Sequence, residues 1–592
     1  MSAPDGPATS SQLAHLIAVA RGDADPDLVI SGARVFLAHT REFIVADVAV
    51  ADGRIAGIGD FSNVTASQNV SGRGRYLIPG LIDAHMHIES SKLTPARFAE
   101  AVLRHGTTCI IAEPHEIGNV LGTRGVQWCM DAASGLPLEM YFMSPSCVPA
   151  SQFESPREAI TPGDMADILR HPRALGIGEM MNFPGVIAGA GSELAKLSVR
   201  GDCHVDGHAP GVSGRALDAY VAAGIGSDHE STTWEEALEK RRRGMWVLLR
   251  EASNARNLLD LLPMVRTYGP DNCAFCTDDR EPDMLLRDGH INQMVRIAVA
   301  DGLPVEDALV MATLNAARAH GLDKRGHGAI APGYHANMVL LDDLIRFDPV
   351  TVWSRGKVVA ELGRVVEFAA DPAPAWVCKT VNVAPVSGSS FALKAPAGSS
   401  QLATPSVRVR AIGAIEGQLI TEPLEVEVPV SDGLMHADPA TDLAKIAVVE
   451  RHHATGRIGS AFVRGFQLKR GAFASTVAHD AHNIVVVGTD DDSMATCVRR
   501  LAELGGGIVV CDGDQVMAEL ALPVAGLMSD EPVEVVAEAM DRCHAALAQR
   551  GVTVDAPFMI LSFLALSVIP SLKLTDHGLV DVDTFQLVPL IV

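Results

Sequence analysis

Histidines and acids stand where predicted strands end, and these residue types can bind a metal ion. His85-Met86-His87 closes an apolar run, and because side chains alternate along a strand, both imidazoles point the same way. Later predicted strands end in further candidates: Glu179, His208, His229 and Asp278. Imidazole and carboxylate donors together suit zinc, manganese or ferrous iron. The pattern therefore predicts a metal centre.

The number of candidate ligands favours two divalent metal ions per chain. The set exceeds what a single tetrahedral zinc takes. We expect His85 and His87 on one ion, His208 and His229 on the other, and Glu179 between the two ions. Manganese or ferrous iron is favoured, and zinc is a further candidate. Water bound to such ions ionises near pH ~7 rather than ~16, so the centre would supply a hydroxide.

The elements that must position these residues are short β-rich runs alternating with amphipathic segments such as PARFAEAVLRHG. The runs that fit strands are 77–87, 107–113, 139–144, 174–180, 201–207, 224–228, 245–250 and 273–278. Eight such units predict an α/β fold with a closed (β/α)8, TIM-like barrel, whose strand C-termini form the active-site face. The candidate ligands would meet there although they lie far apart in sequence.

Changes of composition divide the rest of the chain. Short strands and turns precede the barrel and return after it, which predicts one β-sandwich built from both flanks. A segment rich in Pro, Ala, Ser and Gly follows and is typical of a linker, and a region of mixed strands and helices comes after it. The predicted divisions are an N-terminal extension (1–26), a composite β-sandwich (27–76 with 325–368), the barrel (77–324), the linker (369–405) and a C-terminal α+β domain (406–592).

Composition excludes several classes of partner. The 592 residues include 48 basic and 72 acidic side chains, a net charge of -24, which repels nucleic acids and anionic membranes. The opening residues lack the pattern of a secretory signal, so we expect a cytoplasmic protein. The longest apolar run near the C-terminus, 558–569, is shorter than the ~20 residues of a membrane helix and predicts a buried element.

Several motifs carry a resemblance to a known family. PGLIDAHMHIES, followed by strand-end His, His and Asp, resembles the amidohydrolase superfamily. Within it, AEPHEIGNV, GEMMNFPGV, DGHAPG and CTDDR resemble the bacterial adenine deaminases, as do the later blocks STVAHDAHNIVVVG, LPVAGLMS and LKLTDHGLVD. The likeness covers nearly all of the chain beyond the first two dozen residues. It implies hydrolytic deamination of adenine by a metal-bound hydroxide, in a homo-oligomer such as a dimer.

The sequence departs from the superfamily at two places. Many members bridge their metal ions with a carboxylated lysine on the fourth strand. No lysine occurs between Lys92 and Lys196, so we expect Glu179 to take the bridging role. Mononuclear deaminases place a glutamate shortly after the fifth-strand histidine, whereas His208 is followed by Ala-Pro-Gly. The acid that protonates the purine ring therefore stays open.

The resemblance gives three residues candidate catalytic roles. Asp278 would accept the proton of the nucleophile and pass it to the departing ammonia. Glu89 and His115 are candidates for protonating the ring, and the alternative role for both is to orient metal ligands.

Other interpretations remain open from the sequence. The same centre could open a cyclic amide or remove an acetyl group, and the chain could be an inactive scaffold. In the C-terminal domain, the cluster His479, Asp480, His482 and Asn483 either closes over the barrel mouth or forms a structured turn, and we favour the turn. The basic run 240–243 is interpreted as a solvated helix end.

Overall fold

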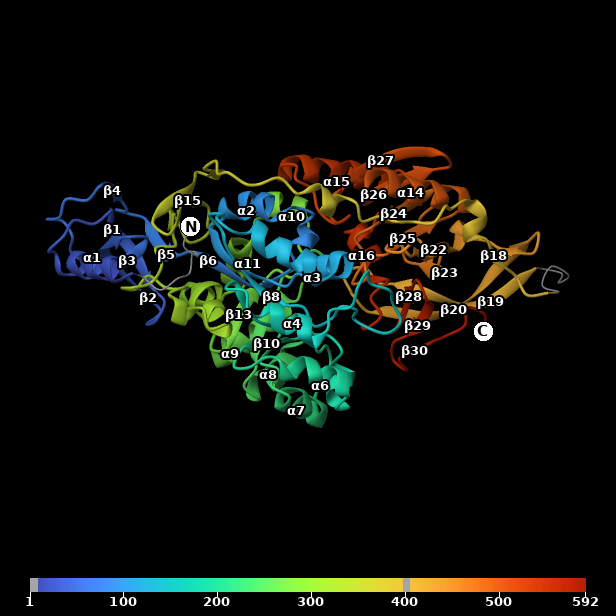
Figure 1. Ribbon diagram of the computed structural model, residues 1–592, viewed down its shortest axis with the longest axis horizontal. Coiled ribbons are helices and arrows are strands. Elements are labelled where there is room, and N and C mark those ends of the chain that lie inside the picture. The colour runs from blue at the N-terminus through green and yellow to red at the C-terminus, as the bar shows by residue number, and fades with distance from the viewer. Residues whose placement is uncertain (1–8, 398–404) are drawn as a thin grey trace.

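The computed structural model describes residues 9–397 and 405–592 of this mixed α/β chain. Figure 1 shows the N-terminal strands at one end of the long axis, the parallel strands and their helices in the middle, and the C-terminal strands and helices at the other end. Among the described residues, no helix has both the length and the apolar character needed to cross a bilayer.

The strands in the middle run parallel and form two sheets. The larger sheet is a half-barrel of β6 (Leu81–Met86), β7 (Thr107–Ala112), β8 (Glu139–Ser144), β9 (Ala174–Met180) and β10 (His204–Gly207). The smaller sheet holds β11 (Ser227–Asp228), β12 (Trp246–Arg250) and β13 (Cys273–Cys276). All eight runs predicted as strands contain one of these strands. The sheets approach each other at a parallel bridge between Met86 and Asp278, and where Gly226 N donates to Val205 O over 2.9 Å.

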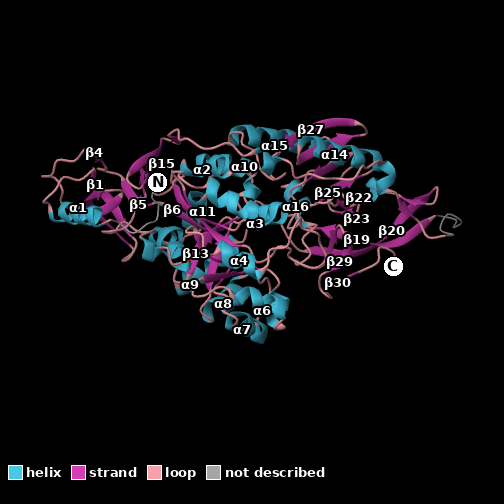
Figure 2. Cartoon of the chain, in the orientation of Figure 1, coloured by secondary structure: helices cyan, strands magenta, loops and turns pink. Residues whose placement is uncertain are grey.

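Helices follow most of these strands, and Figure 2 shows them outside the sheets. They are α2 (Pro95–Leu103), α3 (His115–Ala132), α4 (Pro162–Ile168), α5 (Phe183–Ile187), α6 (Gly191–Ser198), α7 (Gly214–Ala222), α8 (Trp234–Arg242), α9 (Leu258–Tyr268), α10 (Pro282–Arg287), α11 (Ile291–Ala300), α12 (Val305–Val310) and α13 (Ala316–Ala319). Their apolar faces and the sheets bury one continuous core.

The first predicted strand, 77–87, divides at Gly80 into two strands that belong to different sheets. β5 (Tyr76–Pro79) pairs with β14 (Met338–Leu341), and β6 joins the half-barrel. A Cβ at Gly80 would lie 2.0 Å from Thr108 Oγ1, so glycine allows the close approach of the next strand. The run is apolar on both sides of this point, and hydrophobic pattern alone therefore did not reveal the change of sheet.

The two flanks of the parallel region share one nine-stranded sheet. It contains β1 (Leu28–Leu37), β2 (Glu42–Ala51), β3 (Arg54–Gly59), β4 (Gln68–Ser71), β5, β14, β15 (Pro349–Ser354), β16 (Lys357–Glu361) and β17 (Arg364–Val365). Helix α1 (Ser10–Arg21) packs beside β3. The exact limits of the predicted N-terminal extension and linker remain predictions, since both include residues outside the described part of the chain.

The C-terminal region, which we call the C-terminal module (residues 406–592), is built on a ten-stranded sheet. One strand of this sheet, β18 (Leu393–Lys394), precedes the module, and the others are β19 (Ser406–Ala414), β20 (Thr421–Ser431), β21 (Leu434–Met435), β22 (Ala444–Val449), β23 (Ile458–Arg464), β24 (Ala472–Ser475), β25 (Ile484–Gly488), β26 (Gly507–Asp512) and β27 (Gln515–Ala521). A small sheet of β28 (Leu572–Thr575), β29 (Gly578–Asp581) and β30 (Gln586–Leu587) adjoins it, with helices α14 (Asp491–Leu504), α15 (Val533–Ala548) and α16 (Pro557–Phe563).

The basic run 240–243 at the end of α8 was interpreted as a solvated helix end, but one of its residues is buried. Lys240 is buried, with its Nζ 2.7 Å from Asp228 Oδ2 and 2.8 Å from Glu236 Oε1. The helical turn aims this side chain inward while Arg242 stays exposed, and a run of like charges does not reveal which member faces the core. Because Asp228 immediately precedes His229, the buried ion pair helps to fix the end of β11.

The substitution Lys240→Met should lower the free energy of unfolding by about 3–5 kcal/mol, because it leaves the Asp228 carboxylate buried without its partner. Urea unfolding measures this change. The exposed Arg242→Met is the control and should stay within about 0.5 kcal/mol of the wild type. Equal unfolding midpoints for Lys240→Met and the wild type would show that the ion pair does not stabilise the fold.

Candidate metal centre

The carboxylate of Glu179, at the end of β9, lies between two pairs of histidines. Its Oε1 is 3.4 Å from His85 Nε2 and 3.0 Å from His87 Nε2. Its Oε2 is 2.7 Å from His208 Nδ1 and 3.4 Å from His229 Nε2. All five side chains are buried. The structure thus brings together residues from β6, β9 and the ends of β10 and β11, with one carboxylate oxygen toward each pair.

Asp278 approaches the same cluster from the segment after β13. Its Oδ1 is 3.3 Å from His87 Nε2, and its Oδ2 accepts a hydrogen bond of 2.9 Å from Arg250. The backbone of Asp278 has a φ of 55°, in the left-handed region that residues other than glycine rarely adopt. Two backbone hydrogen bonds to β6 hold it there, from Asp278 N to His85 O and from His87 N to Asp278 O. Strained backbone of this kind is common at functional sites.

Outer partners set which imidazole nitrogen faces the cluster. His85 Nδ1 lies 2.7 Å from Asp206 Oδ2, and His87 Nδ1 donates to the carbonyl oxygen of Glu113 over 2.9 Å. With the proton held on Nδ1, each neutral ring presents the lone pair of Nε2 to Glu179 and Asp278. This arrangement of outer hydrogen bonds is typical of metal-binding histidines.

The charges in the cluster favour a cation. Burial opposes a positive charge on His85, but Asp206 and Glu179 outweigh it and raise its pKa to about 10. Burial likewise opposes the charge on His208, yet Glu230 and Glu179 raise its pKa to about 9. The buried His85 Nε2 makes no hydrogen bond. Donor atoms of two groups, His85/Glu179/His229 and His85/His87/Asp278, lie within 4.8 Å of one another, so these residues fit a metal site.

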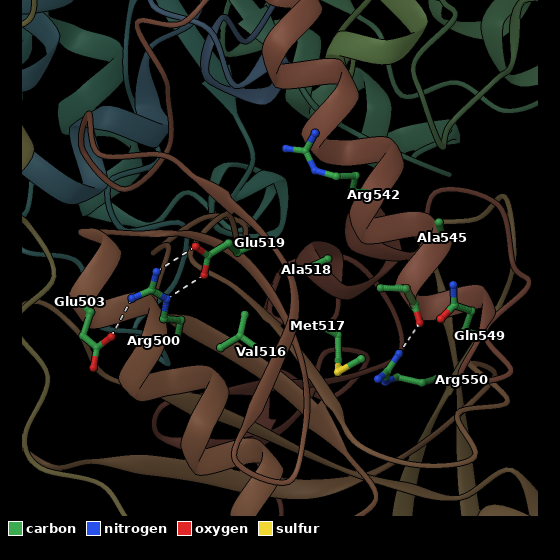
Figure 3. A pocket seen from close by; sticks show the side chains of 11 residues that line it. Arg500, Glu503, Val516, Met517, Ala518, Glu519, Arg542, Ala545, Gln549 and Arg550 are labelled. Atoms are coloured by element: carbon green, nitrogen blue, oxygen red, sulfur yellow. Dashed lines mark hydrogen bonds and ion pairs between the residues drawn. The ribbon is translucent and has the colours of Figure 1, made fainter.

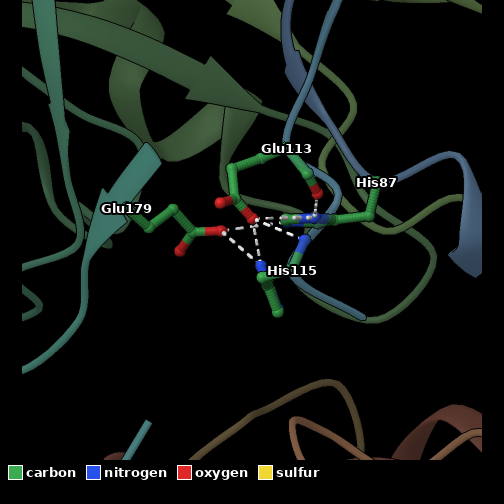
Figure 4. A group of neighbouring side chains, drawn as sticks. All are labelled: His87, Glu113, His115 and Glu179. Atoms are coloured by element: carbon green, nitrogen blue, oxygen red, sulfur yellow. Dashed lines mark hydrogen bonds and ion pairs between the residues drawn. The ribbon is translucent and has the colours of Figure 1, made fainter. Parts of the chain in front are cut away.

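A further group of possible ligands adjoins the cluster. Figure 4 shows Glu113 and His115 directed toward His87 and Glu179. His115 opens α3, and its Nδ1 is hydrogen-bonded to Glu113 Oε2 and lies 3.9 Å from Glu179 Oε1. Its Nε2 is 3.5 Å from Asp480 Oδ1. His115 therefore stands beside the predicted ligands.

Glu89 occupies a different position. Its Oε1 accepts a hydrogen bond of 3.1 Å from the backbone N–H of Ile117, in the first turn of α3. Burial and the nearby Glu116 raise its pKa to about 7. The side chain does not line the cavity that His115 lines. The structure thus places His115 in the lining of the cavity, whereas Glu89 lies outside that lining and contacts the start of α3.

The sequence interpretation missed several charged residues of the site. Glu230 follows β11 and Arg250 ends β12, so the rule that selected Glu179 would also have found them. Arg250 forms ion pairs with both Glu230 and Asp278, and although burial opposes its charge, these carboxylates raise its pKa further. The other missed residues are Glu113, Asp206 and Asp279.

The cluster opens into a small cavity of about 20 Å³. The barrel side contributes every candidate ligand except His85, together with His115, Met181, Glu230 and Asp279. The C-terminal module contributes Leu419, His479, Asp480, Phe563, Leu566 and Ile569. Residues 479–481 do form a turn, but favouring a turn over contact with the barrel was wrong, because this turn lines the cavity. Nothing in the local sequence indicated where the C-terminal module packs.

A larger hollow of about 780 Å³ lies elsewhere, between α14, β27 and α15 of the C-terminal module. Figure 3 shows Arg500 paired with Glu503 and Glu519 at this hollow. Arg500 Nη1 lies 2.9 Å from Glu503 Oε2, and Arg500 Nε lies 2.7 Å from Glu519 Oε2. It contains none of the candidate ligands. This hollow therefore is not part of the candidate metal centre.

Comparison with known proteins agrees with this arrangement. Residues 76–360 match the Amidohydrolase family, which contains the half-barrel and the candidate ligands, and residues 418–586 match the Adenine deaminase C-terminal domain. A solved β-aspartyl dipeptidase from Fervidobacterium islandicum AW-1 is 18% identical with a TM-score of 0.45, covering 59% of this chain and 100% of that chain. The class of protein that the site and the two family matches define is an amidohydrolase.

Relatives of nearly the same length narrow the family. Adenine deaminase 2 of Carboxydothermus hydrogenoformans is 45% identical over 97% of this chain and 99% of its own. The adenine deaminase of Dehalococcoides mccartyi is 43% identical over 98% and 99%, and that of Nitratidesulfovibrio vulgaris strain DP4 is 46% identical over 97% and 98%. The chain belongs to the adenine deaminase family.

The central position of Glu179 can be tested by metal analysis. Glu179→Gln removes the charge between the histidine pairs, so the variant should retain fewer equivalents of divalent metal after dialysis than the wild type. Elemental analysis by mass spectrometry gives this number, and Glu503→Gln, exposed on α14, is the matched control. Metal retention equal to the wild type in Glu179→Gln would contradict a central role for this carboxylate.

Proposed function

We propose that the chain hydrolyses adenine to hypoxanthine and ammonia at a centre of two divalent metal ions. One arrangement carries the proposal: each carboxylate oxygen of Glu179 faces one histidine pair, at 2.7–3.4 Å. The full-length similarity to proteins named adenine deaminase supports adenine as the substrate.

In this proposal His85 and His87 would hold one metal ion and His208 and His229 the other, while Glu179 and Asp278 would serve as further ligands. We propose manganese or ferrous iron as the native metal, and the same nitrogen and oxygen donors accept zinc as well. When bound, such ions lower the pKa of coordinated water and supply a nucleophile near neutral pH.

Asp278 has the position needed to move protons. Burial would raise its pKa, but His87 and Arg250 hold the pKa well below its usual range, so the side chain is ionised. Arg250 binds Oδ2 and leaves Oδ1 toward the cavity. Asp278 Oδ1 then accepts the proton of the attacking water and delivers it to the departing ammonia.

His115 is our candidate for protonating the purine ring nitrogen beside the reacting carbon. Burial opposes its charge, but the carboxylates of Glu113 and Asp480 help to raise its pKa well above the usual value. A protonated imidazole that lines the cavity can donate to the ring. Glu89 is assigned a positioning role, since its carboxyl accepts from the start of α3.

The wider architecture extends the same proposal. We infer that the eight parallel strands close as a (β/α)8 barrel, supported by the Met86–Asp278 bridge, with a composite β-sandwich on one side and an α+β domain on the other. The domain limits predicted from the sequence are part of this inference. A cytoplasmic homodimer is expected as well, and light scattering of the purified chain gives its mass in solution.

Reconstitution tests the reaction directly. Metal-free protein supplied with Mn²⁺, Fe²⁺ or Zn²⁺ should release ammonia from adenine and should not hydrolyse hydantoin, dihydropyrimidine or acetylated sugars. A coupled ammonia assay measures the first rate, and chromatography of the ring-opened or deacetylated products measures the others. Turnover of one of the other substrates without turnover of adenine would assign the centre to a different amidohydrolase reaction.

The role of Asp278 predicts a separable effect. Asp278→Asn should lower kcat by at least about 100-fold, the usual scale for losing a general acid or base, while the fold is retained. Circular dichroism and metal analysis accompany the kinetics, and Asp541→Asn, exposed on α15, is the control. A variant with the kcat of the wild type would reject this role.

A further inference from the structure

An apolar surface closes the cavity on the side of the C-terminal module. We call the side chains of Leu419, Phe563, Leu566 and Ile569 the apolar wall. Leu419 comes from the β19–β20 loop, and the other three come from α16 and the segment after it. The wall lines the same cavity as Glu179 and the histidines. Apolar surface of this kind suits the flat face of an aromatic base.

One buried lysine connects the two segments that form the wall. Lys573 lies on β28 and is fully buried. Its Nζ donates to the carbonyl oxygen of Leu419 over 2.7 Å and to that of Phe563 over 3.1 Å. Both acceptors belong to residues whose side chains form the wall. A single side chain therefore bridges the loop and the helix directly behind the wall.

The surroundings of Lys573 argue against an ordinary stabilising ion pair. Within the described part of the chain it makes no salt bridge, and burial lowers its pKa to about 7. An ammonium has N–H donors for both carbonyls, and a neutral amine still has enough for each. The link therefore persists in either protonation state. A buried charge without a counter-ion is costly, so Lys573 is a poor means of stabilising the fold.

Other contacts fasten the wall to its surroundings. The Phe563 ring stacks on His479, with centroids 4.4 Å apart and planes 9° apart. Ser567 Oγ lies 2.6 Å from Ser151 Oγ on the barrel side, and Asn254 donates to the carbonyl of Gln418, next to Leu419. The contacts of Ser567 and Gln418 hold each segment against the barrel, whereas Lys573 joins the two segments to each other.

We propose that the apolar wall is the surface on which the purine lies and that Lys573 is a positioning residue that sets this wall for substrate binding. The inference rests on the proposed function, because it requires adenine to occupy this cavity, and the cavity must widen from about 20 Å³ to admit a purine. It assigns adenine binding to the C-terminal module and bond cleavage to the cluster around Glu179.

The test compares two buried lysines of the C-terminal module. Lys573→Met removes the link and should raise KM for adenine by about tenfold, equivalent to about 1.4 kcal/mol of binding free energy. The value of kcat should stay within about twofold, since the lost contact acts on binding before and during the reaction alike. The metal content should equal that of the wild type.

Lys445→Met is the matched control. Lys445 is also buried, on β22, but pairs with Asp491 at 2.6 Å and does not contact the wall. This variant should lower the midpoint of thermal unfolding while leaving KM unchanged. Leu419→Ala is a second test variant, because it shortens the wall without altering a buried charge, and it should also raise KM.

The outcomes separate the two proposals. A wild type that does not deaminate adenine with any of the three metals rejects the proposed function. An active wild type together with an unchanged KM in Lys573→Met overturns the inference, whether or not the unfolding midpoint falls. If Lys573→Met does not fold, Leu419→Ala decides, and an unchanged KM in that variant overturns the wall as the purine-binding surface.

Discussion

The placement of the Glu179 carboxylate between two histidine pairs is the constraint on which the site depends. Its oxygens stand 2.7–3.4 Å from four imidazole nitrogens, in a position fully enclosed by protein. Four electron-rich nitrogens and a carboxylate gather there only if positive charge joins them, as protons or as metal ions. The outer hydrogen bonds from Asp206 and from the Glu113 carbonyl direct the first pair toward that charge.

The strand ends hold the candidate ligands at the positions that this arrangement requires. β6 carries the first histidine pair, β9 carries Glu179, and the ends of β10 and β11 carry the second pair. Buried ion pairs fix the remaining members, since Lys240 binds Asp228 beside His229 and Arg250 binds Asp278. Rigid strands supply positions, and the charges behind them supply orientation.

The convergence of these side chains could be predicted from the sequence because strand-end residues follow a local rule. Apolar runs ending in His85, Glu179 and Asp278 were sufficient to place these residues on one face. Packing between distant segments follows no such rule. The inward turn of Lys240, the approach of Asp480 to His115 and the change of sheet at Gly80 all depend on neighbours far away in sequence.

The C-terminal module completes the cavity with chemistry that the barrel side lacks. The barrel contributes mainly histidines and acids, whereas the module contributes the apolar wall and the polar turn at His479 and Asp480.

The most direct test of the account is a crystal of the Mn²⁺-reconstituted protein, with anomalous diffraction at the manganese edge. We predict two anomalous peaks, one on each side of the Glu179 carboxylate. A single peak, or peaks away from Glu179, would contradict a two-metal centre at this position.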